Sequence, residues 1–391
     1  MNREFRIPWS GRSHDYTEED IEFIAYVIRT ADPLTEGVFR DLFESKLTTY
    51  LGVPEGHVFT VDHGTSALEL IAGLCHIEPE DEVIIPAHTF TSSAVPFLRR
   101  GAKIVWADID PDTWCISDWD VAGKITKKTK AIELVHLYGL PADIDAFRTF
   151  GVTLIEDAAQ ALGARYNNRR AGVQTDFGAF SFHGQKNMST FGEGGAIYVK
   201  DPMLAERIPS LRDCGLTPYH GNGDYWKPAM VNVTSVDSFE LPHMMILPEV
   251  PCAIGSRLIE RLDELNIQRE ERYWTFRSEL SAYEELRFQS VPDHCEPSYH
   301  LMPAVYEGPK ANRDDVIRML AYQYSIKAIV QYNPLYRYDL YKKWGCEEAD
   351  VPNTDYFFDN MLSFPNHVWM SDDDFEYMVE STKKTLEALR K

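Results

Sequence analysis

Short apolar runs rich in β-branched and aromatic residues recur through the first half of the chain, and helical stretches such as 66–74 separate most of them. Strands that alternate with helices need crossover connections, so this pattern predicts a largely parallel sheet in an α/β fold. Only a glycine-bearing loop separates the last two runs. The runs that we predict as strands are 58–61, 82–85, 103–106, 131–135, 152–155, 179–182 and 196–199.

Helical periodicity flanks this region on both sides. Thr17 and Asp20 predict a capping box that opens an amphipathic helix, whose apolar face would hold Ile21, Ile24, Ala25 and Ile28. After the sheet region, 254–283 predicts one long charged helix. We therefore predict two domains. The N-terminal helices and a large α/β domain occupy 1–245, and a smaller α+β domain occupies 246–391.

The charge balance limits the classes of partner. The chain of 391 residues has 61 acidic and 39 basic side chains, a net charge of −22. Binding to nucleic acid or to an anionic membrane needs an excess of Lys and Arg, so we expect neither partner. No apolar run reaches about 18 residues and the N-terminus has no apolar signal region, so we expect a cytoplasmic protein. The scattered cysteines predict reduced thiols and no metal site.

The segment 61–68 places a glycine and two hydroxyl residues between a predicted strand and a helix. Gly64 lets the backbone approach a ligand, and Thr65 and Ser66 add donors at the helix N-terminus. Unpaired N–H groups and the positive dipole end suit a phosphate there. An ordinary N-capped helix is the alternative, because Ser and Thr are common caps.

Two further strand ends carry chemistry. Asp157 follows the apolar run 152–155, where a poorly solvated carboxylate needs a cationic or protonated partner, such as a pyridinium nitrogen or an arginine. A structural salt bridge or a helix cap is the alternative. Lys186 lies between a predicted strand end and the glycine-rich turn 192–195. In a partly dry cleft such a lysine is an amine nucleophile, and elsewhere it is a surface lysine in a loop.

The order of these features points to one cofactor. A phosphate cradle, a carboxylate and a lysine match the phosphate, the ring nitrogen and the aldehyde carbon of pyridoxal phosphate. Phe90 follows the second predicted strand, and it either covers the flat face of the ring or is a core aromatic.

These segments resemble the DegT/DnrJ/StrS sugar aminotransferases, which have the aspartate aminotransferase fold, that is, fold type I of pyridoxal-phosphate enzymes. The resemblance covers nearly the whole chain. It is most specific at 156–163 and at 181–186 followed by 192–195. It implies a large domain with a mostly parallel seven-stranded sheet and a smaller α+β C-terminal domain.

Carried over to this chain, the resemblance assigns a role to each site residue. Lys186 would bond the cofactor's aldehyde carbon and move protons, and Asp157 would pair with the ring nitrogen. Gln160 would lie near the phenolic oxygen, and Phe90 would stack on the ring. The remaining assignments are Gly64, Thr65, Ser66 and Ser181 at the phosphate, and His183 and His300 as candidates for contact with substrate.

One segment departs from the family pattern. The family has an Asn and an Arg before the second domain, and the Asn reaches the partner subunit's phosphate. In this chain Met244 and Ile246 occupy those positions, and the preceding segment carries Tyr219, His220, Tyr225 and Trp226. The resemblance implies a homodimer, and the apolar stretch 243–248 favours an interface there, because contiguous exposed apolar surface usually marks one. Packing of this stretch under the small domain is the alternative. The cofactor phosphate in the dimer would be held mainly by its own chain.

The resemblance implies an aminotransferase that moves the amino group of glutamate onto a keto-sugar. The product would be an amino sugar for lipopolysaccharide or another surface polysaccharide. A nucleotide-linked keto-sugar and an eight-carbon 8-keto octulosonate are both candidate acceptors. A sugar dehydratase and a regulatory protein on the same fold are the alternatives. The dehydratase branch has histidine in place of Lys186, and no DNA-binding segment supports regulation.

Overall fold

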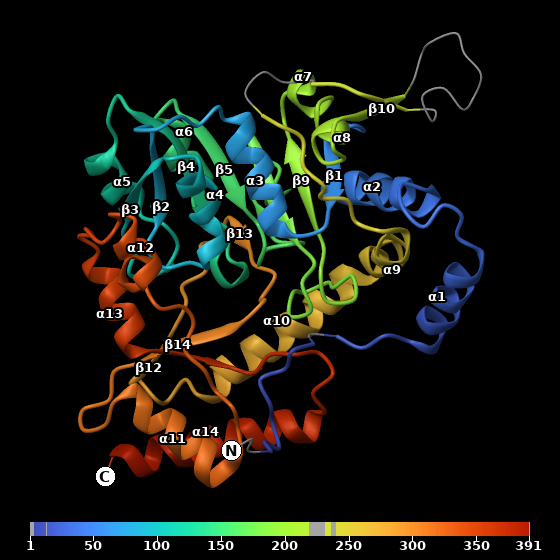
Figure 1. Ribbon diagram of the computed structural model, residues 1–391. Helices are drawn as coiled ribbons and strands as arrows, with labels where there is room; N and C mark the ends of the chain where they lie inside the picture. Colours follow the sequence, from blue (N-terminus) through green and yellow to red (C-terminus); the bar gives the residue numbers. More distant parts are fainter. Residues whose placement is uncertain (1–3, 13, 219–230, 236–239, 391) are drawn as a thin grey trace.

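A twisted sheet of seven strands forms the centre of the molecule, in the order β1-β9-β8-β5-β4-β2-β3 (Figure 1). The computed structural model describes residues 4–12, 14–218, 231–235 and 240–390. Strand β9 is antiparallel to both of its neighbours, and the other pairings are parallel. The strands are β1 Val58–Val61, β2 Glu82–Pro86, β3 Lys103–Ala107, β4 Thr129–Val135, β5 Thr153–Asp157, β8 Phe177–Ser181 and β9 Gly195–Val199.

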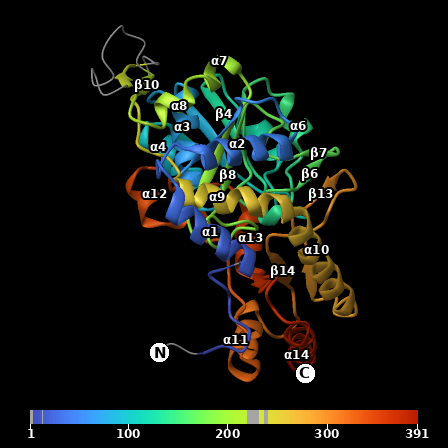
Figure 2. The same cartoon turned by 90° about the vertical axis from the view of Figure 1, so that its right-hand side faces the viewer.

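Helices cover both faces of this sheet, which gives three layers. Helices α3 (Gly64–Leu74) and α4 (Val95–Arg99) pack on one face in an apolar cluster with Ile85, Ala131 and Ile155. On the other face, α1 (Glu18–Thr30), α2 (Val38–Leu51) and α9 (Glu249–Leu258) lie together, as Figure 2 shows. The same face also carries α5 (Asp118–Lys124) and α6 (Ile144–Arg148).

The C-terminal part builds a smaller three-stranded antiparallel sheet, β12-β14-β15, with three helices packed against it. Its strands are β12 Leu286–Phe288, β14 Met302–Tyr306 and β15 Met361–Phe364, and its helices are α10 Leu262–Glu279, α11 Arg313–Tyr324 and α14 Asp372–Arg390. The remaining elements are β6 Arg165–Tyr166, β7 Arg169–Arg170, β10 Leu216–Pro218, β11 Val231–Val233, β13 Cys295–Glu296, α7 Pro202–Ala205, α8 Ile208–Leu211, α12 Asp339–Lys343 and α13 Pro352–Asn360.

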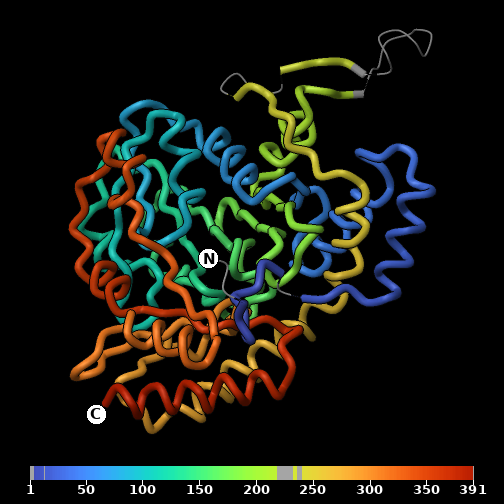
Figure 3. Tube along the Cα trace, turned by 60° about the horizontal axis from the view of Figure 1, so that its bottom comes forward, coloured from blue at the N-terminus to red at the C-terminus, as the bar shows by residue number. Residues whose placement is uncertain are grey.

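The N-terminal segment crosses from the small sheet to the large one. Ile7 forms a β-bridge with Ile326 and is buried in the apolar cluster of the small sheet. A few residues later, the Ser10 carbonyl accepts a hydrogen bond of 3.3 Å from Gln185. Figure 3 shows this blue segment passing close to the red C-terminal part. We predict a division at 245/246, but two segments cross it. Helix α9 follows residue 245 and packs on the large sheet, whereas Ile7 precedes residue 245 and packs on the small sheet.

The predicted α/β fold with a mostly parallel seven-stranded sheet is confirmed, and all the predicted strands are present. The capping box forms, since Thr17 and Asp20 bond each other's backbone N–H groups. Two expectations were wrong. On α1, Ile21 and Ile28 are exposed and Ile24 is buried beside Val27, because Asp20 bonds Arg257 and Arg261 and turns its own face toward α9. The predicted helix 254–283 is broken by a short 3-10 turn between α9 and α10.

Candidate active site

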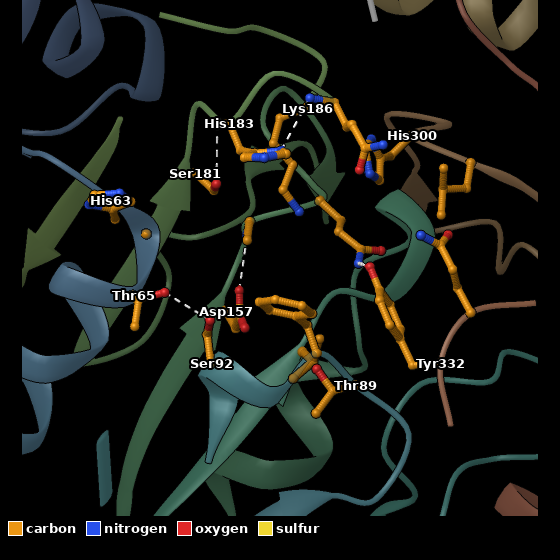
Figure 4. A pocket seen from close by; sticks show the side chains of 18 of the residues that line it. His63, Thr65, Thr89, Ser92, Asp157, Ser181, His183, Lys186, His300 and Tyr332 are labelled. Atoms are coloured by element: carbon orange, nitrogen blue, oxygen red, sulfur yellow. Dashed lines mark hydrogen bonds between the residues drawn. The ribbon is translucent and has the colours of Figure 1, made fainter. Parts of the chain in front are cut away.

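The carboxyl ends of the parallel strands open onto a cavity of about 400 Å³. Gly64 and Thr65 follow β1, Phe90 follows β2, Asp157 ends β5 and Ser181 ends β8. Ligands of open α/β sheets bind at this edge, because the loops after the strands converge there. Figure 4 shows Thr65, Asp157, Ser181 and Lys186 around the same space. We call these strand-end residues the cofactor half of the cavity.

Two glycines allow the first turn of α3 to approach β8 and β9. A Cβ on Gly64 would lie 3.0 Å from Cβ of Ser181, and a Cβ on Gly195 would lie 2.5 Å from the Gly64 nitrogen. Thr65 lines the cavity and shares a hydrogen bond of 2.8 Å with Ser92. Ser66 is turned inward, since its hydroxyl donates to Asp62 and its N–H donates to the His63 carbonyl.

The Asp157 carboxylate is buried and held by two donors. Its Oδ1 accepts the N–H of Ala159 at 3.0 Å, and its Oδ2 accepts the hydroxyl proton of Ser93 at 2.9 Å. Ser93 belongs to a short 3-10 turn, η1 (Thr91–Ser93), after β2. No arginine or lysine forms an ion pair with Asp157 within the described residues, so the salt bridge considered from the sequence is not what fixes it. The carboxylate faces the cavity and is available to a cationic ring nitrogen.

Lys186 reaches the same cavity from the loop between β8 and β9. Burial lowers the pKa of Lys186 to about 8, although the negative charge of Asp157 raises it. A buried ammonium loses hydration, so the neutral amine is favoured. At neutral pH this lysine therefore has a substantial fraction of nucleophilic amine, unlike a surface lysine.

Phe90 and Gln160 occupy the middle of the cavity wall. Phe90 is 53% exposed, so it is a wall residue and not a core aromatic. Gln160 is fixed on both sides, because its Oε1 accepts the N–H of Tyr138 at 2.7 Å and its Nε2 donates to the Tyr332 hydroxyl at 3.1 Å. This anchoring presents the Gln160–Tyr332 pair to a ligand in the cavity.

The two predicted histidines lie on either side of the lysine. The ring Nδ1 of His183 accepts the backbone N–H of Gln185 at 3.3 Å, and the backbone N–H of His183 donates to the Ser181 hydroxyl at 3.4 Å. His300 shares a hydrogen bond of 2.9 Å with Asn187. Burial lowers the pKa of His300 well below its usual value, and the positive charge of Lys186 adds to this shift. His300 is therefore neutral at physiological pH.

The opposite side of the cavity comes from distant parts of the chain. It is formed by Arg12, Arg269, His300, Asn366 and His367, which we call the far wall. Arg269 lies on α10 and donates from Nη1 to the Asn366 carbonyl at 2.7 Å. Sequence reasoning identified His300 and missed the other four, and it also missed Ser92, Ser93 and Tyr332. None of the missed residues lies in a glycine-rich turn or directly at a strand end, so no local pattern marks them.

The departure at Met244 and Ile246 is visible in the structure. Met244 forms a β-bridge with Asp213 and is 59% exposed, while Leu247 is buried in the cluster beneath α9. Neither Met244 nor Ile246 lines the cavity of this chain. The notable residues Tyr219, His220, Tyr225 and Trp226 fall outside the described residues. In the described part of the chain, no helix is both long enough and apolar enough to cross a bilayer.

Pyridoxal phosphate fits the residues of the cofactor half. The first turn of α3 opens on the cavity at Gly64 and Thr65, with Ser181 beside them, and a helix N-terminus with hydroxyl donors suits the phosphate. The buried Asp157 carboxylate suits a protonated ring nitrogen, and Lys186 supplies an amine with a lowered pKa. These features on this sheet define a pyridoxal-phosphate-dependent enzyme of fold type I.

Comparisons with known proteins identify the family. The DegT/DnrJ/EryC1/StrS aminotransferase family matches residues 15–383, and the chain belongs to this family. It is 30% identical over 372 residues to the dTDP-3-amino-3,4,6-trideoxy-alpha-D-glucose transaminase of Streptomyces venezuelae, covering 92% of this chain and 91% of that protein. It is 31% identical over 362 residues to the spore coat polysaccharide biosynthesis protein SpsC of Bacillus subtilis, covering 90% of each.

A solved structure gives the same result for the fold and the cofactor. The PMP form of Spr1654 from Streptococcus pneumoniae superposes with a TM-score of 0.88 at 26% identity, over 98% of this chain and all of that one. A PLP form of the same protein is also similar, with a TM-score of 0.86. The protein is therefore a pyridoxal-phosphate-dependent aminotransferase.

Proposed function

We propose that this aminotransferase moves the amino group of glutamate onto a keto-sugar and so makes an amino sugar for a surface polysaccharide. The observation that carries the proposal is the cavity of about 400 Å³, which has the cofactor half on one side and the cationic far wall on the other. A glutamate and a keto-sugar must bind there in turn, because Lys186 moves the proton in both halves of the reaction. The names of the Streptomyces and Bacillus relatives, a sugar transaminase and a polysaccharide biosynthesis protein, support this class of product.

The residues of the cofactor half divide the chemistry among them. Pyridoxal phosphate, when bound, supplies the carbonyl carbon that takes the amino group and the conjugated ring that accepts an electron pair. Lys186 Nζ removes and returns the proton at the amine-bearing carbon, and its pKa of about 8 suits both directions near neutral pH. Asp157 keeps a negative charge against the ring nitrogen and so favours its protonated form.

The far wall supplies the recognition of substrate. Arg269 is buried, and burial lowers its pKa only to about 10, so it remains a cation at neutral pH. Arg12 lines the same cavity with a half-exposed side chain that also pairs with Asp15. A carboxylate is the group that glutamate brings to this wall, and guanidinium groups bind carboxylates through paired N–H donors. An acceptor with its own acidic group would use the same contacts in the second half of the reaction.

This wall favours an acceptor that carries an anionic group. The 8-keto octulosonate has a carboxylate and a nucleotide-linked keto-sugar has a diphosphate, and both remain candidates for the wall. We favour the octulosonate, because the carboxylates of donor and acceptor can share Arg269 and because the departure at Met244 and Ile246 removes polar groups typical of the family.

Isotope transfer tests the proposal. Purified protein is incubated with ¹⁵N-glutamate and either the keto-octulosonate or dTDP- and GDP-linked keto-hexoses, and products are read by mass spectrometry. We expect ¹⁵N in one amino sugar and 2-oxoglutarate in equal amount, and none with Lys186→Ala. Conversion of glutamate to 2-oxoglutarate without any labelled sugar would contradict the proposed acceptors. Loss of water from a sugar without transfer of ¹⁵N would favour a dehydratase.

We also propose that the active unit is a cytoplasmic homodimer whose cofactor phosphate is held mainly by its own chain. The support is the exposed Met244 at the edge of the stretch 243–248, together with the own-chain donors Thr65 and Ser181 at the cavity. Light scattering of the active protein should give about twice the chain mass of 44.8 kDa. A stable, active monomer would contradict the dimer.

A further inference from the structure

A second buried carboxyl group lies behind Asp157 and has no part in the chemistry described above. Glu133 is in the interior of β4, and its exposed fraction is 0%. Its side-chain neighbours in the same layer are apolar, including Ala131 and Ile155. Interior strands of parallel sheets are normally apolar throughout, so a carboxyl group at this position is costly unless it is used.

The strand register directs Glu133 and Asp157 to the same face of the sheet. Val135 pairs with Asp157 and Glu133 pairs with Ile155 across β4 and β5. Side chains alternate with a period of two along each strand, so Glu133 projects on the same side of the sheet as Asp157. It lies two residues further along the strands from the cavity. Neither carboxyl oxygen of Glu133 has a hydrogen-bond partner among the described residues.

The groups around Glu133 favour its uncharged form. Burial raises the pKa of Glu133 well above its usual value, the negative charge of Asp157 raises it further, and Ser93 opposes the shift. Tyr341 on α12 and Cys75 after α3 also face this region. Burial raises the pKa of each to about 12. At neutral pH, therefore, the titratable neighbours other than Asp157 are uncharged.

The hydrogen-bond chain at Asp157 has a place for one more donor. Ser93 has a single hydroxyl proton and gives it to Asp157 Oδ2, so the hydrogen bond of 2.9 Å between Thr89 and Ser93 must be donated by Thr89. The Ser93 oxygen has a second lone pair, and a protonated carboxyl group has one donor. We propose that Glu133 is a positioning residue: its uncharged carboxyl group supports the Ser93–Asp157 pair from behind and holds the Asp157 carboxylate against the ring nitrogen of bound pyridoxal phosphate.

Two substitutions separate this role from simple packing. Glu133→Gln keeps the shape and a donor, whereas Glu133→Leu keeps only the apolar volume. The dissociation constant for pyridoxal phosphate is measured by absorbance titration of the apo protein, and unfolding in urea is followed in parallel. We expect Glu133→Gln to bind within about twofold of the native protein and Glu133→Leu up to about tenfold more weakly, the size of one hydrogen bond. The urea midpoint of the apo Glu133→Leu protein should not fall.

A matched control comes from the same sheet. Glu82 on β2 is buried and bonds Thr126 and Lys103 away from the cavity. Glu82→Leu should lower the urea midpoint and leave cofactor affinity unchanged. Native affinity in Glu133→Leu, or equal weakening by Gln and Leu at position 133, would overturn the proposal.

A pH series with the Gln variant alone gives a second test. An uncharged Glu133 in the fold binds a proton that the unfolded chain loses above its usual pKa of about 4.3. The free energy of unfolding of the apo Glu133→Gln protein should therefore increase relative to that of the apo native protein as the pH rises from 4 to 7. A difference that stays constant over this range would show a charged Glu133 and overturn the proposal.

Discussion

The cofactor half and the far wall of the cavity are built in different ways. Asp157 and Ser181 end strands of one sheet, and each accepts the backbone N–H of the residue two positions further on. Arg12, Arg269 and His367 come from the N-terminal segment, α10 and the region after β15, and contacts between distant segments hold them. The sheet edge therefore positions the cofactor half, whereas the packing of the small sheet on the large one positions the far wall.

Lys186→Ala should give the largest effect and confine it to the cofactor half. Amine transfer should fall by at least about 10³-fold, since nucleophile and proton carrier are lost together. Borohydride should fix the cofactor to the peptide that contains Lys186 in the native protein and to none in the variant. Lys200→Ala, a change at an exposed lysine after β9, is the control. Labelling of any other lysine in the native protein would contradict the assignment.

Arg269→Gln tests the far wall, where we expect substrate binding to weaken while cofactor binding is unchanged. We expect KM for glutamate to rise by about 10- to 100-fold, because a charge-assisted pair with the carboxylate is lost, and cofactor affinity to stay unchanged. Circular dichroism checks the fold, since Arg269 also bonds the Asn366 carbonyl. Arg277→Gln, farther along the same helix, is the matched control. Equal loss of cofactor and substrate affinity would break the division between the two halves.

The pH dependence of cofactor attachment sharpens the comparison. Only the neutral amine of Lys186 attacks an aldehyde, so the attachment rate to the apo protein should rise with pH and level off above about 8. At pH 6 it should be about 100-fold below the plateau. His300 of the far wall adds no further inflection to this pH profile, because its ring is neutral between pH 6 and 9. The control is acetyl-lysine amide with a free side-chain amine, whose rate of reaction with the cofactor should keep rising up to about pH 10.4. A flat rate between pH 6 and 9 would be the contrary result.

The smallest expected effect concerns the phosphate. Ser181→Ala should weaken binding of pyridoxal phosphate by about fivefold, the size of one ordinary hydrogen bond, whereas Met244→Ala should leave it unchanged. Equilibrium dialysis of the apo proteins measures both. A greater loss from Met244→Ala would show that the stretch 243–248 supports the phosphate after all.

The same contrast explains how much could be predicted from the sequence. The strands and Lys186, Asp157 and Ser181 were predictable, because each strand end is marked by a local change from apolar to polar or glycine residues. Ile21 and Ile28 were assigned to the wrong face of α1, because the ion pairs of Asp20 with Arg257 and Arg261 decide the rotation of that helix. Those arginines lie more than 200 residues away, and helical periodicity carries no information about them.

The missed site residues have the same explanation. Arg269 lies on a helix full of charged residues, and nothing in its spacing distinguishes it from Arg272 or Arg277. Ser92 and Ser93 follow Phe90 in a short turn, where hydroxyl residues are ordinary. Their function follows from contacts with Thr65 and Asp157, which depend on how two strands and a helix come together.

The N-terminal segment ties two mechanical parts of the molecule together. Ile7 is fastened to the small sheet through Ile326, and Ser10 is fastened to Gln185, the residue before Lys186. Because so few residues join the two fastenings, there is little slack between them. We therefore expect a displacement of the small sheet relative to the large one to shift the loop that carries Lys186. A change in the number of residues between Ile7 and Ser10 should then move Lys186 without substituting any residue of the cofactor half.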